Sequence, residues 1–283
     1  MMQIEVRLLR EADIPAALRL KELVLWNQTE NDWRRLLRLQ PSGCFCATSG
    51  GKVVATTTTT AYGRELAWIG MVLVDPEWRR LGIATKLIRA ALDYLIQAGV
   101  ATIKLDATPD GRLVYENLGF KVDSLIERWE GVGGGSQAVG CSMLDTSTRS
   151  EALALDRQAF GADRSTLIKM LIEDAYVSPL VATAADARLI GYALARRGSA
   201  AAYIGPLVAT DANAATTLLD GLLSQMSGQR VYIDLNTNFG EGRKILARRG
   251  LVKQRDLIRM SYGKGSKAGS SSSVFAIAGP EIG

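Results

Sequence analysis

The sequence contains no histidine, which removes the commonest general base and the commonest metal ligand of proteins. Any catalysis therefore has to use carboxylates, tyrosines, thiols, water or backbone groups, and we expect no bound metal. The sequence also lacks an apolar run of the roughly 18 residues that cross a bilayer, and its first residues, MMQIEVRLLREAD, lack the apolar core of a signal peptide. We expect a cytoplasmic protein with no membrane partner.

Cysteine is scarce, with three residues in a chain of 283. An odd number of cysteines in a long chain without a secretion signal favours reduced thiols over a disulfide framework. Cys44 and Cys46 lie two residues apart in a predicted strand, so their side chains share one face. A packing role is favoured over a chemical one there.

Charge of one sign is not concentrated anywhere: 34 Lys and Arg residues against 29 Asp and Glu residues give a net charge of +5 without a basic block. This pattern argues against a nucleic-acid partner, because nucleic-acid-binding domains carry a clustered basic patch. It is compatible with a site for a polyanionic small molecule. An apolar fraction of 47% in 283 residues is enough for one large domain or two medium ones.

The chain divides into two halves, with the glycine-rich segment 131–137, GVGGGSQ, as the linker between them. We predict a first domain at 1–131, a second at 132–262, and a low-complexity tail at 263–283 in which VFAIAG can dock as a short strand. Each half has a predicted strand, helix and strand in this order. They span 65–75, 83–99 and 100–108 in the first half, and 201–211, 212–228 and 229–236 in the second.

The two halves also match residue by residue. Ile69-Gly70 aligns with Ile204-Gly205, and Gly119 aligns with Gly250. A long internal match of this kind indicates two copies of one α/β module.

The turn between strand and helix distinguishes the first copy, because the second copy has no residues to match Arg79, Arg80 and Gly82. A helix start leaves N–H groups unpaired and carries the positive end of the helix dipole, and a glycine lets an anion approach the backbone. A diphosphate fits such a turn, with an arginine adding charge. The alternative is an ordinary turn with exposed arginines. The second copy also has Leu246 where the first has Tyr115.

The pattern Val74-x-Pro76-x-x-Arg79-x-x-Gly82-Ile83-Ala84 resembles the coenzyme A signature of the GNAT superfamily of N-acetyltransferases, and VYENLGF at 114–120 resembles its second motif. These motifs cover residues 1–131, and the second half resembles the degenerate partner domain of tandem GNAT proteins. The resemblance implies an α/β (α+β) fold. It consists of two tandem GNAT-like modules, each a mixed, splayed, largely antiparallel sheet flanked by helices.

The resemblance also implies a site. In GNAT enzymes the pantetheine arm pairs with the strand before the signature, here Met71–Val74, and the diphosphate lies on N–H groups, here Arg80–Thr85. An N–H near Val72 or Leu73 would polarise the carbonyl of the acetyl group and stabilise the negative charge that its oxygen gains during transfer. Tyr115 would be the catalytic proton donor to the departing thiolate. The residues implied to bind coenzyme are Val72, Leu73, Val74, Arg79, Arg80, Leu81, Gly82, Ile83, Ala84 and Thr85.

The residues do not single out a general base. The proton of the amine can leave through water to one of four carboxylates or to none of them; the four are Asp106, Asp32, Glu30 and Glu65. Thr108 stands where the family often has an asparagine that contacts pantetheine. Trp26, Asn27 and Trp33 lie in the region that usually walls the acceptor pocket. Trp26 and Trp33, seven residues apart, are equally compatible with two core residues of one helix.

The resemblance implies an acetyl-CoA-dependent N-acetyltransferase that moves an acetyl group directly to a primary amine of a small-molecule acceptor. The alternatives are a non-catalytic sensor of acyl-CoA and a small ligand, and a two-domain scaffold whose arginine turn is only surface. Tyr115 favours the enzyme, because a pure binder needs no proton donor at the sulfur. The chain is expected to be a monomer or a homodimer. The second half offers candidates for an acceptor pocket or for surface ion pairs: Asp163, Arg164, Arg196 and Asp234.

Overall fold

The computed structural model describes residues 4–135, 139–265 and 271–283. Residues 136 and 137 of the predicted linker and residues 266–270 of the predicted tail lie outside the described residues. The described chain forms two compact units. The first contains residues 4–122, 260–265 and 282, and the second contains residues 123–259, 271–281 and 283.

The first unit alternates strands and helices in a fixed order. Three single-turn 3-10 helices at Glu11–Asp13, Pro76–Trp78 and Pro109–Gly111 join these elements. The order is β1 (Glu5–Leu8), α1 (Ile14–Glu22), α2 (Glu30–Leu39), β2 (Phe45–Ser49), β3 (Lys52–Tyr62), β4 (Leu66–Val74), α3 (Ile83–Gln97), β5 (Thr102–Ala107), α4 (Arg112–Glu116) and the start of β6 (Lys121–Val132).

The second unit repeats this order, which confirms that the chain holds two copies of one α/β module. One further short strand, β13 (Val274–Ala276), follows the repeat. The repeated elements are β7 (Cys141–Met143), α5 (Arg149–Phe160), α6 (Ser165–Glu173), β8 (Leu180–Thr183), β9 (Leu189–Arg196), β10 (Ala202–Ala209), α7 (Ala212–Gln225), β11 (Arg230–Asn236), α8 (Gly242–Ala247) and β12 (Val252–Gly263).

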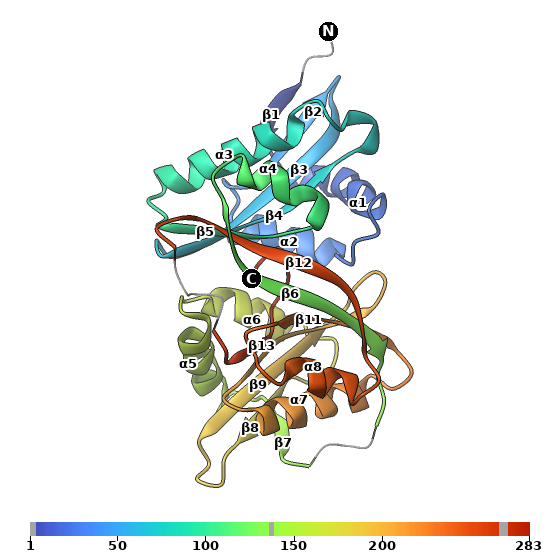
Figure 1. Ribbon diagram of the computed structural model, residues 1–283, viewed down its shortest axis with the longest axis vertical. Helices are drawn as coiled ribbons and strands as arrows, with labels where there is room; N and C mark the ends of the chain where they lie inside the picture. Colours follow the sequence, from blue (N-terminus) through green and yellow to red (C-terminus); the bar gives the residue numbers. More distant parts are fainter. Residues whose placement is uncertain (1–3, 136–138, 266–270) are drawn as a thin grey trace. The chain divides into compact units, whose positions relative to one another are not determined.

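In the first unit the strands lie in the order β1-β2-β3-β4-β5. All neighbouring pairs are antiparallel except β4 and β5, which are parallel. Helix α3 covers one face of β2, β3 and β4, and α1 and α2 cover the other (Figure 1). The side chains of α3 that are buried recur every three or four residues, as a helix on a sheet requires; they include Ile83, Leu87, Ala91 and Leu95.

In the second unit the strands lie in the order β12-β6-β11-β13-β10-β9-β8-β7. Helix α7 packs on β8, β9 and β10 and contributes side chains to an apolar core of this unit: Ala214, Ala215, Leu218, Leu219, Leu222 and Leu223, with Ala212 packed against it. The mixed, largely antiparallel sheets with flanking helices confirm the predicted fold class.

Strand β13 lies between β10 and β11. These two parallel strands pair directly over Ala202–Ile204 and Val231–Ile233, and then diverge. Beyond that point Ala276 of β13 is paired with Leu207 of β10 and with Leu235 of β11. The gap between the diverging strands is therefore filled by the chain itself.

A buried ion pair holds the middle of the second unit together. Asp234 of β11 is 0% exposed and accepts hydrogen bonds from Nε and Nη2 of Arg128 at 2.8 and 2.6 Å, and from the hydroxyl of Tyr203 at 3.0 Å. Burial by itself lowers the pKa of Arg128, but the charge and hydrogen bonds of Asp234 raise that pKa above its ordinary value. The guanidinium therefore stays charged.

Removal of the Asp234 carboxylate would leave a buried, unpaired guanidinium. We expect Asp234→Ala to lower the free energy of unfolding by about 3 kcal/mol or more, the usual size for breaking a buried pair from one side. Asp186→Ala, which breaks the exposed pair between Asp186 and Arg188, should cost less than about 1 kcal/mol. Urea denaturation of both variants measures the difference, and equal losses would contradict this role of Asp234.

Candidate active site

Strands β4 and β5 pair over three residues and then separate. Leu66, Ala67 and Trp68 of β4 lie opposite Thr102, Ile103 and Lys104 of β5. From Ile69 to Val74, the edge of β4 that faces β5 has no strand partner among the described residues. Main-chain N–H and C=O groups of this edge are therefore available to pair with an extended ligand.

A β-bulge lies in the middle of this unpaired edge. Thr56 of β3 is paired with Leu73, and Thr58 is paired with Gly70, so Met71 and Val72 together lie opposite the single residue Thr57. Met71 has a φ of 49°, in the left-handed region that side chains other than glycine rarely adopt. The bulge turns successive peptide groups of β4 out of the regular alternation.

The hydrogen bond of Asp75 shows which β4 residues face the unpaired edge. Its amide donates to the carbonyl of Val54 in β3 at 2.9 Å. Because main-chain groups alternate in direction along a strand, those of Val74 point away from β3, whereas those of Leu73 point toward it. The Met71 carbonyl accepts the Thr56 hydroxyl of β3 at 2.9 Å, so the Val72 amide of the same peptide also points away from β3. Val72 and Val74 are also partly exposed, whereas the Leu73 side chain is buried.

The turn after β4 leads to a helix start without a side-chain cap. Arg80 has a φ of 64° and Gly82 has a φ of 73°, and α3 begins at Ile83. The first bond to the helix runs from the amide of Lys86 to the carbonyl of Gly82 at 3.1 Å, so the amides of the first helical residues have no acceptor within the helix. A Cβ at Gly82 would meet no atom within 4 Å. The N-terminal end of α3 is therefore open to an anion.

This turn brings together most of the residues predicted to bind a diphosphate. Arg79, Arg80, Leu81 and Gly82 are exposed, whereas the Ile83 side chain is buried under the helix. Arg79 Nε donates to the carbonyl of Val74 at 3.3 Å. Ala84 and Thr85 are half-buried in the first turn of α3.

The corresponding helix start in the second unit is closed. Asp211 is the N-cap of α7, and its carboxylate accepts the amide of Ala214 at 2.9 Å. A carboxylate at this position fills the site that an anion would use and repels it. The residue that matches Met71 is Pro206, which has no N–H, and the residue that matches Tyr115 is the buried Leu246.

Tyr115 lies on α4 and is half-buried. Its ring packs edge-on against Phe120, with centroids 6.0 Å apart, and no group in the described parts of the chain is hydrogen-bonded to its hydroxyl. Burial raises the pKa of this phenol well above its ordinary value. The hydroxyl therefore stays protonated at neutral pH and is free to donate. Thr108 instead caps the short helix before α4, where its Oγ1 accepts the amide of Gly111 at 3.3 Å.

The candidate bases lie in different surroundings. Asp32 is buried, accepts the amide of Thr29 at 2.7 Å and is paired with Arg35 at 2.7 Å, so it caps α2. Glu30 is exposed and paired with Arg34 at 2.6 Å. Glu65 is exposed before β4, and Asp106 is half-buried near the end of β5.

The alternative in which Trp26 and Trp33 are core residues of one helix is wrong. Helix α1 ends at Glu22 and α2 begins at Glu30, so Trp26 lies in the connecting loop. The break is local: Thr29 and Asp32 form a capping box that starts a new helix. Trp33 is fully buried under α2, and Asn27 is also buried.

Three of the four charged residues singled out in the second half are buried, so the expectation of surface ion pairs is wrong for them. Arg164 is paired with Asp156 at 2.9 Å, Arg196 is paired with Glu281 at 3.1 Å, and Asp234 is paired with Arg128. Their alternation with apolar residues in the sequence did not distinguish an internal network from a surface one. These side chains hold the second unit together.

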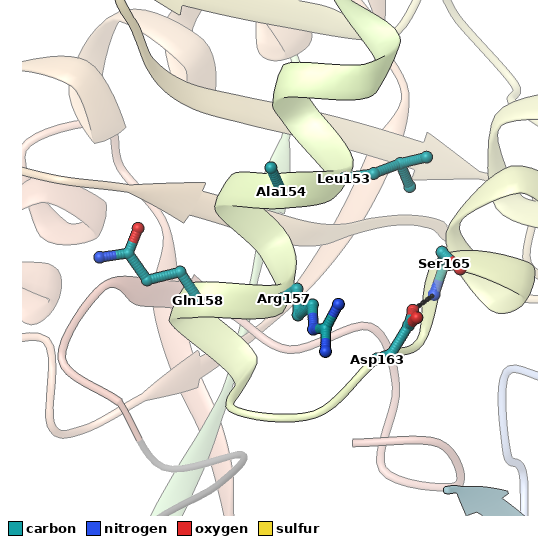
Figure 2. A pocket seen from close by; sticks show the side chains of 6 residues that line it. All are labelled: Leu153, Ala154, Arg157, Gln158, Asp163 and Ser165. Carbon is teal, nitrogen blue, oxygen red and sulfur yellow. Dashed lines mark hydrogen bonds between the residues drawn. The ribbon is translucent and has the colours of Figure 1, made fainter.

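The fourth residue, Asp163, lines an open pocket of about 610 Å³ on the second unit (Figure 2). Its carboxylate accepts the amide of Ser165 at 2.9 Å, which caps the start of α6. The other lining residues of the pocket are Leu153, Ala154, Arg157 and Gln158.

Within the described residues, no cluster of three or more histidine, cysteine or carboxylate side chains has an arrangement that could bind a metal. None of the helices in this part of the chain is long and apolar enough to cross a membrane.

Comparison with protein families explains the repeated architecture. The model of the acetyltransferase (GNAT) family matches residues 9–120, and the model of the acetyltransferase (GNAT) domain matches residues 152–276. Together the two matches cover most of the chain. The protein is a tandem GNAT acetyltransferase. It therefore belongs to a family of acyltransferase enzymes.

Individual relatives agree with this assignment. The uncharacterized N-acetyltransferase YitH of Bacillus subtilis is 28% identical over 190 residues, which cover 66% of each chain. A putative acetyltransferase of Pyrococcus horikoshii has the same fold, with a TM-score of 0.83 and 21% identity over 99% of this chain and 96% of that one. A tandem GNAT protein from the clavulanic acid biosynthesis pathway aligns with a TM-score of 0.69 and 15% identity, over 93% and 99% of the two chains.

Two features of the site were missed by sequence reasoning. The bulge at Met71 was not predicted, although the run of five threonines at 56–60 in the neighbouring strand is an unusual signal for a buried strand. Asp211 was read as the end of a strand, although an aspartate before a helix is a common cap.

Asp75 anchors the turn that precedes the helix start, and its ionisation should control the stability of the first unit. Burial raises its pKa, but hydrogen bonds from Arg19 at 2.8 Å and from the amide of Glu77 bring the net pKa below its ordinary value. A depressed pKa in the folded state adds stability above the unfolded pKa of about 3.9, and this stability is lost as the pH falls through the folded pKa.

We therefore expect wild type to be more stable than Asp75→Asn at neutral pH, with the difference shrinking below about pH 4. Urea denaturation of both proteins between pH 7 and acidic pH, within the range where both still fold, measures it. A difference that stays constant as the pH falls would show that the charge of Asp75 contributes nothing.

Proposed function

We propose that the first unit transfers an acetyl group from acetyl-CoA directly to a primary amine of a small-molecule acceptor. The observation that carries this proposal is the combination, in one unit, of an unpaired β4 edge, an uncapped start of α3 and a protonated Tyr115. When bound, acetyl-CoA supplies the acetyl group as an activated thioester.

Two parts of the first unit fit the two chemical parts of coenzyme A. The main-chain groups of Val72 and the amide of Val74, which have no strand partner among the described residues, match the amides of a pantetheine arm, which pairs like an added strand. The open amides of Ile83–Thr85, with Arg79 and Arg80 beside them, match a diphosphate. Leu73 contributes packing rather than main-chain pairing in this proposal, because its main-chain groups face β3.

We assign the amide of Val72 as the hydrogen-bond donor to the carbonyl oxygen of the acetyl group. It lies in the bulge, and no strand residue is paired with it among the described residues. A fixed N–H directed at an oxygen that gains negative charge lowers the barrier without any rearrangement of the protein.

Tyr115 is the group we assign as proton donor to the departing sulfur. Its hydroxyl is protonated at neutral pH, and no group in the described parts of the chain is hydrogen-bonded to it, so it can donate to a thiolate within hydrogen-bond distance. Asp32 and Glu30 are engaged in ion pairs that support the fold, so the proposal leaves deprotonation of the amine to water, with Asp106 and Glu65 as the two other candidate carboxylates.

The role we propose for the second unit is structural, without coenzyme of its own. Three features support this proposal: Asp211 caps α7, β13 fills the gap between β10 and β11, and Leu246 replaces the tyrosine. The alternative function is a non-catalytic sensor of acyl-CoA. The following experiment would favour this alternative if the protein binds coenzyme A but transfers no acetyl group.

We expect Tyr115→Phe to lower kcat by about a hundredfold or more, as the loss of a general acid does. The Kd for coenzyme A should stay close to that of wild type, because the phenol is not assigned to coenzyme binding. Thiol release from acetyl-CoA with a panel of primary amines measures the rate, and calorimetry measures the Kd. The matched control is Tyr94→Phe on α3, which removes a tyrosine hydroxyl that is hydrogen-bonded to Gln40.

Two results would contradict the proposal. If wild type binds coenzyme A but releases no thiol with any amine, the protein is a binder and not an enzyme. If Tyr115→Phe keeps the wild-type kcat, another group protonates the sulfur.

A further inference from the structure

Five consecutive threonines, 56–60, lie in β3, the strand beside the bulge. All five are almost completely buried, with exposed fractions of 0–1%. A buried hydroxyl without a hydrogen bond is costly, so each should have a partner or a reason to lack one. Valine would fill the same space in a strand without that cost.

Two of these hydroxyls bond to the bulge itself. Thr56 Oγ1 donates to the carbonyl of Met71 at 2.9 Å, and Thr57 Oγ1 donates to the carbonyl of Gly70 at 3.4 Å. Thr59 Oγ1 instead donates to the carbonyl of Gly43 at 2.9 Å. The hydroxyls of Thr58 and Thr60 have no hydrogen-bond partner in the described parts of the chain.

The carbonyl that Thr56 holds belongs to the same peptide group as the amide of Val72. A trans peptide directs its N–H opposite to its C=O, so the bond from Thr56 directs the Val72 amide away from β3. A hydrogen bond to the carbonyl also polarises the peptide and makes its N–H a stronger donor.

Met71 needs such support. A non-glycine residue at a φ of 49° is unfavourable and persists only when its surroundings hold it there. The hydroxyls of Thr56 and Thr57 bond to the carbonyls of the two successive residues Met71 and Gly70. They therefore stabilise the conformation that a regular strand would not adopt.

The second unit provides an internal comparison. The strand that corresponds to β3 is β9, and by the register of the two sheets the residues that correspond to Thr56–Thr59 are Tyr192–Ala195, with the sequence YALA. The threonine hydroxyls are thus absent from the unit whose gap is filled by β13. The unit that keeps its β4 edge unpaired is the one that keeps them.

We propose that Thr56 is a positioning residue for acetyl transfer: through the Met71–Val72 peptide it aims and polarises the amide that stabilises the carbonyl oxygen. This inference rests on the proposed function and adds a residue that does not touch the substrate. Thr57 supports the preceding peptide in the same way. Thr58, on the same strand and equally buried, has no such role.

The test compares Thr56→Val with Thr58→Val, which remove one buried hydroxyl each from neighbouring positions and keep the volume. Thr56→Val should lower kcat by about tenfold, the size of one hydrogen bond to a peptide, while the KM for acetyl-CoA stays within about twofold. Thr58→Val should leave kcat unchanged. Thr56→Ser, which keeps the hydroxyl, should restore most of the rate.

A spectroscopic measurement makes the test independent of the acceptor. Acetyl-CoA labelled with ¹³C at the thioester carbonyl is bound to each protein, and the infrared band of this carbonyl is compared with that of the free compound. Polarisation by the Val72 amide should shift the band to lower wavenumber in wild type, Thr58→Val and Thr56→Ser, and shift it less in Thr56→Val. Thermal melting identifies any unfolded variant; if Thr56→Val fails to fold, Thr56→Ala and Thr58→Ala provide the same comparison.

The outcomes separate this inference from the proposed function. If wild type does not bind acetyl-CoA, both are wrong. If wild type shifts the carbonyl band and transfers acetyl, but Thr56→Val keeps the full shift and the full kcat, the inference is wrong and the proposed function stands. Equal losses in Thr56→Val and Thr58→Val would also overturn it, because they would reflect packing of the strand.

Discussion

Unpaired main-chain groups at the divergence of two parallel strands are the constraint on which both units depend. In each unit these strands pair over three residues and then separate, β4 from β5 and β10 from β11. Buried backbone N–H and C=O groups need partners. The second unit meets this need with its own strand β13, whereas the first leaves the edge of β4 for a partner that the proposed function identifies as pantetheine.

The same contrast holds at the helix that follows the diverging strand. Both α3 and α7 begin with unpaired amides and the positive end of a helix dipole. Asp211 supplies the negative charge for α7 from within the chain, whereas Gly82, with a φ of 73°, leaves the start of α3 open. One module thus appears twice, once with its polar groups satisfied internally and once with the same groups available to a ligand.

Much of this architecture could be predicted from the sequence, because it follows from local patterns. The apolar runs, the glycines after α3 and α7 and the internal match between the halves define the repeated strand-helix-strand order. The turn at Arg79–Gly82 was found because the second copy lacks it. The break between Trp26 and Trp33 was missed, because a spacing of seven residues satisfies a helix whether or not a cap interrupts it.

The details that position the candidate site depend on contacts between residues far apart in the sequence. The bulge at Met71 is defined by its register against β3, and its support by Thr56 is visible once both strands are placed. The burial of Arg164 and Arg196 likewise depends on partners more than eighty residues away, at the end of the chain. Sequence periodicity indicates which apolar residues are buried, but not which distant group a buried charge meets.

The central claim is that coenzyme A binds the unpaired edge of the first unit and not the filled gap of the second. Backbone amide NMR of the ¹⁵N-labelled protein, titrated with coenzyme A, tests it directly. We expect large shifts for the amides of Val72, Val74 and Ile83–Thr85, and no shifts for those of Leu207 and Leu235 beside β13. Shifts at Leu207 and Leu235 without shifts at Val72 and Val74 would contradict it.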